Sequence, residues 1–219
     1  YSWDLDEVHK YLQQPHLDGY IAGDFKNFDT SYVKEFQEAA YAIIQSLSCK
    51  FVTEREFLAF KKHEMEDPIV QFNGRLFKLR VLHASGLLFT TIINNFVNEM
   101  YCRYAFAKLN PTLDFNQHIR MKVLGDDHII SVSDRCRFTP FLYRDILAGL
   151  GQTYTNDVKT VPLSDNLKTF EECTFLGSHP RRHRGRWYGA CRKDTLWQTI
   201  QWQKSSVDHQ ECVAACIEL

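Results

Sequence analysis

The chain has 219 residues, 44% of them hydrophobic, and a formal net charge of −1 at pH 7. This length and composition suffice for a real core in one or two domains. The near-neutral charge excludes a uniformly basic nucleic-acid binder, so any such binding has to come from local patches. Seven scattered cysteines without a Cys-x-x-Cys pair favour reduced thiols in a cytosolic compartment over a disulfide framework or a zinc ribbon. No apolar run in the sequence is long enough to cross a bilayer.

The first 47 residues predict a helix, a strand and a second helix. Residues 5, 8 and 12 are apolar at helical spacing, and a strand is expected over residues 20–23, ending at Asp24. A turn then leads into a helix from about residue 31 to 47 with one apolar stripe. Asp24 and Asp29 flank this turn and can point into the same crevice, although alone they could be a loop charge and a helix cap.

Residues 48–84 separate this first part from the rest of the chain. Residues 48–67 are charged and helical in character, and residues 69–72 and 75–81 are strand-like. Asn73-Gly74 between these strands is a strong signal for a two-residue hairpin turn. The block interrupts the parts of the chain that carry the notable carboxylates, and we interpret it as an insertion.

A long helix is predicted from about residue 88 to 109, ended by Asn110-Pro111. Thr90, Asn94 and Asn98 lie four residues apart and therefore share one face of this helix. Asparagine is unfavourable in the middle of a helix unless its amide has a role or faces water. The pattern alone leaves both explanations open.

Residues 121–132 predict a strand-turn-strand hairpin whose tip is Gly125-Asp126-Asp127. Gly125 supplies the backbone freedom that the turn requires. Two adjacent carboxylates repel each other, so a positive group is expected near them, most simply a divalent metal. A lone Gly-Asp-Asp is also compatible with a solvated acidic turn.

The remainder predicts a helix over 140–150, a strand over 152–155, and a loop carrying Asp157 and Lys159. A second hairpin is expected from residues 173–176 through a basic turn to residues 186–188, followed by a helix over 194–219. Between Arg181 and Lys193, basic residues alternate with aromatic ones and no acid occurs, which suits a nucleic-acid strand. The order of elements indicates an α+β fold with helices packed on a small antiparallel sheet.

Together, these patterns resemble the palm of an RNA-dependent RNA polymerase (RdRp) of the picornavirus-like type, whose motifs A to E occur here in order. They are Asp24 and Asp29; Ser85, Gly86, Thr90 and Asn94; Gly125, Asp126 and Asp127; Lys159; and Phe175 and Leu176. Any one of these motifs is weak evidence, whereas the ordered set is specific.

The resemblance implies a division of the chain into a palm start (residues 1–47), a fingers insertion (48–84), the main palm (85–194) and the beginning of a helical thumb (195–219). The family carries further fingers before the palm and most of the thumb after it. The chain is therefore expected to be an incomplete part of a larger polymerase and weakly active by itself.

The resemblance also implies roles for individual residues. Asp24 and Asp126 are expected to hold two Mg²⁺ ions, with Mn²⁺ as a substitute, and Asp127 to be an auxiliary metal ligand. Lys159 is expected to be the general acid that protonates the pyrophosphate, which completes the catalytic set. The residues expected to bind the nucleotide and its ribose 2′-hydroxyl are Asp29, Ser85, Gly86, Thr90 and Asn94.

The RNA strand is expected to contact Phe175 and Leu176. Gly177 follows them where the family usually has a Lys-Arg pair, so Arg181 and Arg182 are expected to supply the positive charge on the primer side.

The implied function is template-directed RNA synthesis in the genome replication of a positive-strand RNA virus. The implied partners are template RNA, a primer or product strand, NTPs and other viral replication proteins, and the implied location is the host cytoplasm at viral replication complexes.

Three alternatives stay open at this point. A reverse transcriptase-like polymerase would usually carry an aromatic residue two positions before its paired aspartates, where this chain has Leu124. A catalytically silent RNA-binding palm module would not require the acids at 24, 126 and 127. A metal-dependent nuclease explains neither the Ser85–Thr90–Asn94 pattern nor its place in the order.

Overall fold

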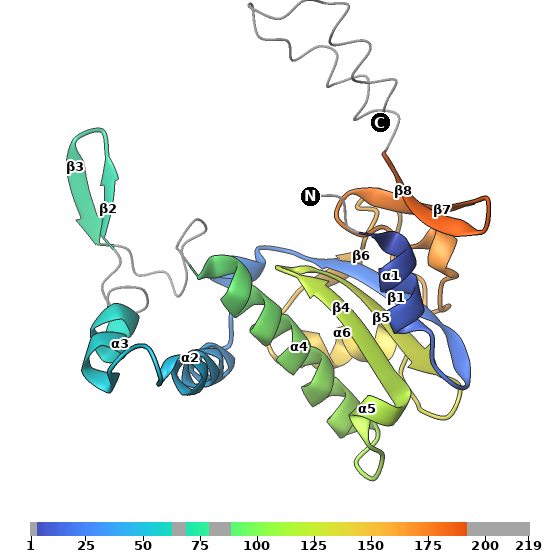
Figure 1. The fold of residues 1–219 in the computed structure, drawn as a ribbon, viewed down its shortest axis with the longest axis horizontal. Coiled ribbons are helices and arrows are strands. Elements are labelled where there is room, and N and C mark those ends of the chain that lie inside the picture. The colour runs from blue at the N-terminus through green and yellow to red at the C-terminus, as the bar shows by residue number, and fades with distance from the viewer. Residues whose placement is uncertain (1–3, 63–68, 79–88, 192–219) are drawn as a thin grey trace, which may run out of the picture.

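The computed structural model describes residues 4–62, 69–78 and 89–191 (Figure 1). Their centre is a four-stranded antiparallel sheet in the order β4-β5-β1-β6. The strands are β1 (Leu17–Phe25), β4 (Ile119–Leu124), β5 (Asp127–Ser133) and β6 (Tyr154–Asn156). Helices cover this sheet, and two separate hairpins complete the described part, so the predicted α+β class is confirmed.

One face of the sheet packs against α4 (Thr90–Leu109) and α6 (Pro140–Gly149), and α2 (Lys34–Ser48) packs on α4 and joins the same core. Because side chains alternate along a strand, the paired residues Ile21 and Ile130 both point to this face. They join a core that includes buried Tyr101 of α4 and Tyr143 of α6. The long helix α4 runs beside β4 and crosses the end of α2 (Figure 1).

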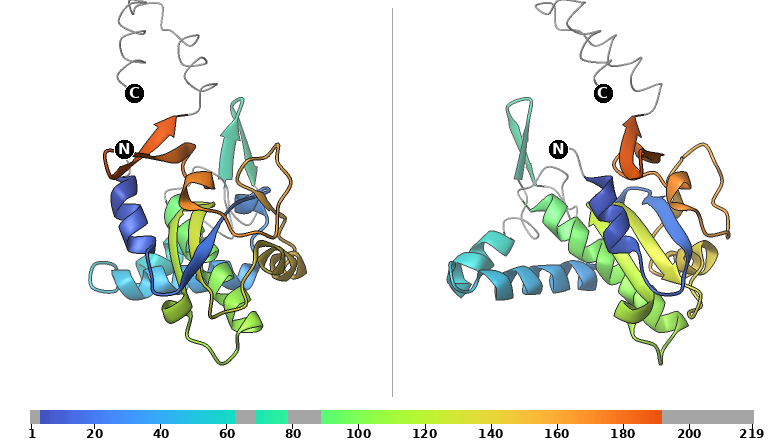
Figure 2. Two further views of the ribbon diagram at one scale, coloured as in Figure 1. Left: turned by 90° about the vertical axis from the view of Figure 1, so that its right-hand side faces the viewer. Right: turned by 45° about the vertical axis from the view of Figure 1, so that its right-hand side comes forward.

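The opposite face of the sheet carries a second, smaller core. Tyr20, Ala22 and Ile129 point to this side and meet α1 (Leu5–Leu12) and the segment around Phe170. The views in Figure 2 show α1 and the hairpin of β7 (Ser178–His183) and β8 (Arg186–Cys191) together on this side of the sheet. Strand β1 is therefore buried on both faces and paired along both edges, which makes it a rigid support for the residues at its end.

Helix α3 (Glu54–Lys61) and the hairpin of β2 (Ile69–Phe72) and β3 (Arg75–Lys78) lie away from the sheet (Figure 1). The capping box of Thr53 and Glu56 fixes the start of α3. The hairpin turns at Asn73-Gly74, as predicted, and both residues have positive φ. A short helix α5 (Phe115–His118) leads from α4 to β4. The division into palm, fingers and thumb stays a prediction, and the helix predicted over 194–219 lies outside the described residues.

The second predicted hairpin forms, but its predicted first strand over residues 173–176 is wrong. The strands are β7 (Ser178–His183) and β8 (Arg186–Cys191), joined at Arg184-Gly185. Leu176 and Gly177 both have positive φ, and Phe175 and Ser178 exchange two backbone hydrogen bonds across them. The chain therefore makes a tight turn first. Arg181 and Arg182 then fall in strand β7, Arg184 lies in the turn between the strands, and Arg186 begins β8.

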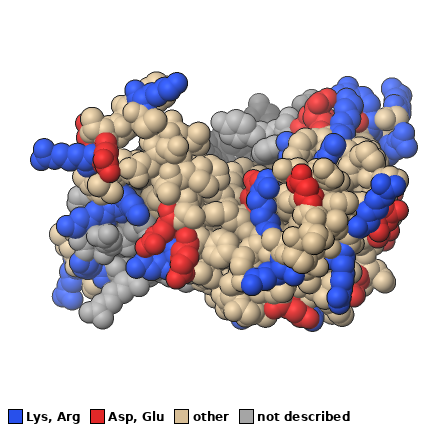
Figure 3. Space-filling view, turned by 90° about the horizontal axis from the view of Figure 1, so that it is seen from below, with Lys and Arg blue, Asp and Glu red and all other residues tan. Residues whose placement is uncertain are grey.

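Acidic and basic side chains are interspersed on the surface shown in Figure 3, consistent with the near-zero net charge. Cys49, Cys102, Cys136 and Cys173 carry free thiols. Within the described ranges, no helix combines the length and the apolar character needed to span a membrane.

Candidate active site

A pocket of about 670 Å³ opens where β1 ends beside the turn between β4 and β5. Six of the nine residues predicted for catalysis and nucleotide binding line it, together with Gly125: Asp24, Asp29, Thr90, Asn94, Asp126 and Lys159. Four stretches that are distant in sequence thus supply one pocket. Ser85 and Gly86, predicted to belong to the same site, lie outside the described residues.

The position of Asp24 follows from the sheet. Asp24 is the penultimate residue of the central strand β1, opposite Thr155 of β6, whose hydroxyl donates a hydrogen bond of 3.3 Å to the Asp24 carbonyl. On the other edge of β1, β5 and β4 connect through Gly125-Asp126. Gly125 has φ +68°, a left-handed conformation that glycine adopts without strain, and this allows the tight turn that brings Asp126 to the pocket.

Two asparagines of α4 that the sequence did not assign hold this turn in place. The fully buried Asn98 donates through Nδ2 to the carbonyls of Gly125 (3.2 Å) and Asp126 (3.0 Å). The Oδ1 of Asn95 accepts the Gly125 N–H at 2.6 Å. The spacing of Asn98 from Asn94 pointed to this face of the helix, but Asn95 carried no sequence signal. Helix α4 therefore positions the carboxylate-bearing turn directly.

Like charges meet at the pocket. Burial raises the pKa of Asp126, and the carboxylates of Asp24 and Asp29 raise it further, while the Lys159 ammonium acts in the opposite direction. The Nζ atom of Lys159 lies 3.0 Å from Oδ2 of Asp24, and this contact raises the pKa of the lysine. One ammonium thus faces three carboxylates, and the pocket favours additional positive charge.

Asp127 is not among the residues that line this pocket. Its Oδ2 accepts the backbone N–H of Leu176 at 2.6 Å, which connects the turn to the segment before β7. Burial raises the pKa of Asp127 to about 7, and the carboxylates of Asp126 and Asp24 add to this shift, whereas the bond from Leu176 opposes it. The structure thus gives Asp127 a backbone partner; its auxiliary role toward a metal stays a prediction.

Two of the five residues predicted to bind the nucleotide and its ribose, Asp29 and Asn94, contact each other. Nδ2 of Asn94 donates to Oδ1 of Asp29 at 2.7 Å, and both side chains border the pocket. The other amide atom, Oδ1 of Asn94, is buried and has no hydrogen-bond partner among the described residues. This paired carboxylate and amide can offer hydrogen-bonding atoms to a hydroxyl that enters the pocket.

His128 follows Asp127 in β5, is fully buried, and shares a hydrogen bond of 2.8 Å with the Tyr154 hydroxyl. Burial lowers the pKa of His128 to about 4, so the ring is neutral near pH 7. The Tyr154 ring occupies the space that a Cβ at Gly23 would need, and Gly23 pairs with His128 in the sheet. The strand end that carries Asp24 therefore lies against the stacked rings of His128 and Tyr154, and the Tyr154 ring leaves no space for a side chain at position 23.

The predicted RNA-binding residues do not form one cluster. Phe175 is buried in the smaller core, and the Leu176 backbone binds Asp127. Arg181 donates to the carbonyls of Glu171 (3.0 Å) and Pro180 (2.9 Å). Arg182 is the next residue of β7, so its side chain points to the opposite face of the hairpin.

The donor set at the pocket suits a hard divalent cation. Mg²⁺ prefers carboxylate oxygens and is usually bound by one or two of them, with waters and substrate phosphates completing its shell. Asp24 and Asp126 provide such carboxylates, and the mutual repulsion that raises the pKa of Asp126 would be relieved by a cation. Among the described residues, no group of three or more His, Cys, Asp or Glu side chains forms a ready-made metal site. The residues present therefore fit a cation that completes its shell from substrate.

The structure is thus an α+β protein with a carboxylate-lined pocket at one end of its antiparallel sheet. The sequence model of the family described as viral RNA-dependent RNA polymerase matches residues 1–219. The chain therefore belongs to the viral RNA-dependent RNA polymerase family, and the resemblance expected from its motifs is confirmed.

Individual relatives are viral polyproteins. The replicase polyprotein of Cricket paralysis virus is 25% identical over 245 residues, which covers 96% of this chain and 13% of that protein. The replicase polyprotein of Drosophila C virus is 23% identical over 252 residues, covering 100% of this chain and 14% of the relative. The RNA1 polyprotein of Broad bean wilt virus 2 is 31% identical over 141 residues, or 61% of this chain and 8% of the relative. The chain thus corresponds to a small part of each relative.

Proposed function

We propose that this chain is the palm region of a larger RNA-directed RNA polymerase that replicates the genome of a positive-strand RNA virus. The observation that carries the proposal is the pocket in which Asp24, Asp126 and Lys159 meet the Asp29–Asn94 pair. Family membership supports the activity, and the pocket supports the assignment of roles within it.

The reaction is the attack of a ribose 3′-hydroxyl on the α-phosphate of an incoming NTP, with pyrophosphate as the leaving group. Divalent cations, Mg²⁺ or Mn²⁺, supply Lewis-acid stabilisation of the phosphate oxygens when bound. Asp24 and Asp126 would hold them through their carboxylate oxygens. Lys159, whose ammonium already lies at the pocket beside Asp24, would donate a proton to the leaving pyrophosphate oxygen.

The Asp29–Asn94 pair would recognise the ribose 2′-hydroxyl. Asparagine can donate or accept a hydrogen bond and an ionised aspartate accepts one, so the pair matches a hydroxyl. A site built to bond a hydroxyl rejects the analogue that lacks it, because its own polar groups are then left unpaired. This arrangement supports the incorporation of ribonucleotides and distinguishes the proposal from a reverse transcriptase.

The proposed partners follow from this chemistry: template RNA, a primer or product strand, NTPs and other viral replication proteins. The proposed place of action is the host cytoplasm at viral replication complexes. The chain corresponds to 8% to 14% of the polyproteins described above, and the activity is proposed for the longer polymerase of which this chain forms part.

The test is primer extension by the full-length polymerase with rNTPs and with dNTPs, in Mg²⁺ and in Mn²⁺. Asp126→Asn should abolish extension while RNA binding is retained, because loss of the cation clamp removes several kcal/mol of transition-state stabilisation. Asp145→Asn is the matched control, since its exposed carboxylate pairs with the neighbouring Arg144 on α6.

Three outcomes would contradict the proposal. An Asp126→Asn enzyme that retains more than about a tenth of the wild-type rate would remove Asp126 from the reaction. Preferential extension with dNTPs would favour a reverse transcriptase. RNA binding by a wild-type enzyme that extends no primer would indicate a catalytically silent module.

A further inference from the structure

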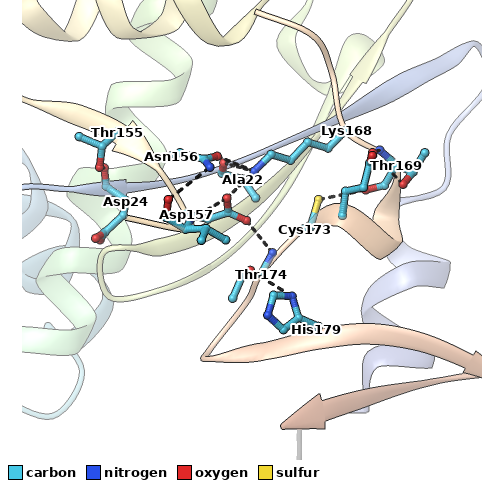
Figure 4. Close-up of polar contacts among 12 residues, drawn as sticks. Ala22, Asp24, Thr155, Asn156, Asp157, Lys168, Thr169, Cys173, Thr174 and His179 are labelled. Atoms are coloured by element: carbon cyan, nitrogen blue, oxygen red, sulfur yellow. Dashed lines mark hydrogen bonds and ion pairs between the residues drawn. The ribbon is translucent and has the colours of Figure 1, made fainter. Parts of the chain in front are cut away.

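A buried carboxylate outside the pocket joins several segments of the site. The Asp157 side chain is 3% exposed and lies in the loop just after β6 (Figure 4). It forms an ion pair with the Lys168 ammonium and accepts the backbone N–H of Val158 at 3.0 Å and of Thr174 at 2.7 Å. Asp157 therefore has partners on its own loop, on the segment that returns to β1 and on the segment that leads to β7.

Lys168 fixes this carboxylate to the central strand. Its Nζ also donates to Oδ1 of Asn156 at 2.7 Å and approaches the Ala22 carbonyl at 3.5 Å. Its backbone N–H and C=O exchange two 2.8 Å hydrogen bonds with Tyr20. The ion pair is thus bound to β1 at Tyr20 and Ala22, and Figure 4 shows the contact with Ala22, two residues before Asp24.

Lys159, two residues after Asp157, depends on this anchor. Its side chain is 80% exposed and reaches Asp24 across a long flexible stem. An exposed lysine with such a stem is not held by packing, so the position of its ammonium follows the position of the loop backbone. The bond from Val158 N–H to the Asp157 carboxylate fixes that backbone one residue before Lys159.

From this geometry we propose that Asp157 is a positioning residue of the polymerase. Its ion pair with Lys168 sets the loop so that the Lys159 ammonium reaches the Asp24 side of the pocket. The inference rests on the proposed role of Lys159 and deepens it.

A purely structural ion pair is the competing explanation. Buried ion pairs are weak evidence for stability by themselves, because desolvation offsets much of the attraction. The contacts of Asp157 favour positioning because they lead to segments that also carry Lys159, Asp24 and the Asp127 contact. The two explanations differ in whether the effect of Asp157 passes through Lys159.

The experiment is single-nucleotide extension by the full-length polymerase, with Asp157→Asn made in the wild-type background and in a Lys159→Met background. Asp157→Asn preserves shape, and it should lower kcat about tenfold or more in the wild type, because small displacements of a reacting group are costly. The KM for NTP and the Kd for RNA should change less than about twofold. In the Lys159→Met background, Asp157→Asn should cause no further fall in kcat.

A second set of variants tests the ion pair. Lys168→Met should lower kcat as Asp157→Asn does, and the double variant should fall no further than the more impaired single variant, because the two residues act as one unit. Lys168→Arg keeps the charge and should retain more activity than Lys168→Met. The matched control is Asp165→Asn in the same connecting segment: its carboxylate accepts from the Thr139 hydroxyl (2.6 Å) and the Phe141 N–H (2.9 Å), away from the pocket lining. It should leave kcat unchanged.

The results separate this inference from the proposed function. If the wild-type enzyme extends primers, Asp126→Asn does not, and Asp157→Asn keeps wild-type kcat, the positioning role alone is overturned. An equal fall in both Lys159 backgrounds, or a change confined to KM, overturns it as well. A wild type that extends no primer overturns the proposed function together with this inference.

Discussion

Asn98→Ala offers a direct test of how α4 holds the acidic turn. The substitution removes two hydrogen bonds, to the carbonyls of Gly125 and Asp126, at a fully buried position. At roughly 0.5–1.5 kcal/mol for each bond, the expected loss of stability is about 2 kcal/mol, since both carbonyls lose a donor. For a domain of 150–250 residues this lowers the Tm by roughly 4–8 °C, and by less in a longer polymerase that unfolds as one unit. The kcat of the Asn98→Ala variant should also fall, because the same turn carries the Asp126 carboxylate.

The measurements are thermal unfolding and primer extension of the full-length polymerase. Asn98→Asp and Asn95→Asp provide a matched pair on one helix. Asn98 uses its amide as a donor, so an aspartate there would face two carbonyl oxygens, whereas Asn95 uses its oxygen as an acceptor and an aspartate keeps that bond. Asn98→Asp should therefore lower the Tm more than Asn95→Asp. Equal shifts, or an Asn98→Ala enzyme with wild-type Tm and turnover, would refute the reasoning.

Three further outcomes are expected. Asn94→Ala should lower kcat/KM for rNTPs more than for dNTPs. The difference in transition-state stabilisation should be roughly 0.5–1.5 kcal/mol for the lost bond and up to about 3 kcal/mol with Asp29 left unpaired. If the ratio of kcat/KM for rNTPs to that for dNTPs is the same in wild type and variant, Asn94 has no role in sugar recognition. Neutralising Arg181 and Arg182 together should weaken RNA binding similarly for all sequences and flatten its salt dependence, and an unchanged salt slope would leave them as surface charges. Burial raises the pKa of Asp127 to about 7, whereas the same carboxyl in the unfolded chain has a pKa of about 4. Between about pH 4 and pH 7 the folded state therefore binds one more proton than the unfolded state, so the free energy of unfolding should decrease as the pH rises from 4 to 7. In metal-free buffer the Tm should therefore drop from pH 5 toward pH 8, and less so in Asp127→Asn; equal profiles would contradict the raised pKa.

The sequence predicted those site residues whose placement depends on local geometry. Asp24 and Asp29 are separated by one short turn, and Thr90 and Asn94 by one turn of helix, so their convergence follows from spacing. Gly125 marked the hairpin tip because a tight turn needs its positive φ. The α+β class followed from the order of the elements and their periodicity.

The remaining contacts depend on how distant segments meet. The Asp157–Lys168 ion pair joins residues of an irregular segment, where no periodicity indicates which side chains converge. His128 carried no signal either, because its burial depends on Tyr154, which comes 26 residues later. The hairpin starting at Ser178 was placed too early, since the apolar run at 173–176 is also what a buried segment before a turn contains.

The fit of the Tyr154 ring beneath Gly23 bears on how this protein can diverge. Any side chain at position 23 would displace the Tyr154 phenol, and with it the hydroxyl that pairs with His128. A substitution at position 23, 128 or 154 therefore limits the residues that the other two positions can accept. A larger residue at 23 would need a smaller residue at 154 and also a shift of the Thr155 carbonyl, which lies 2.8 Å from the position of the added Cβ. The loss of Tyr154 in turn leaves the buried His128 imidazole without its partner. Each single step along such a path passes through an impaired strand end beside Asp24. The two rings therefore restrict the mutational routes open to a replicating lineage more tightly than the exposed residues around the pocket do.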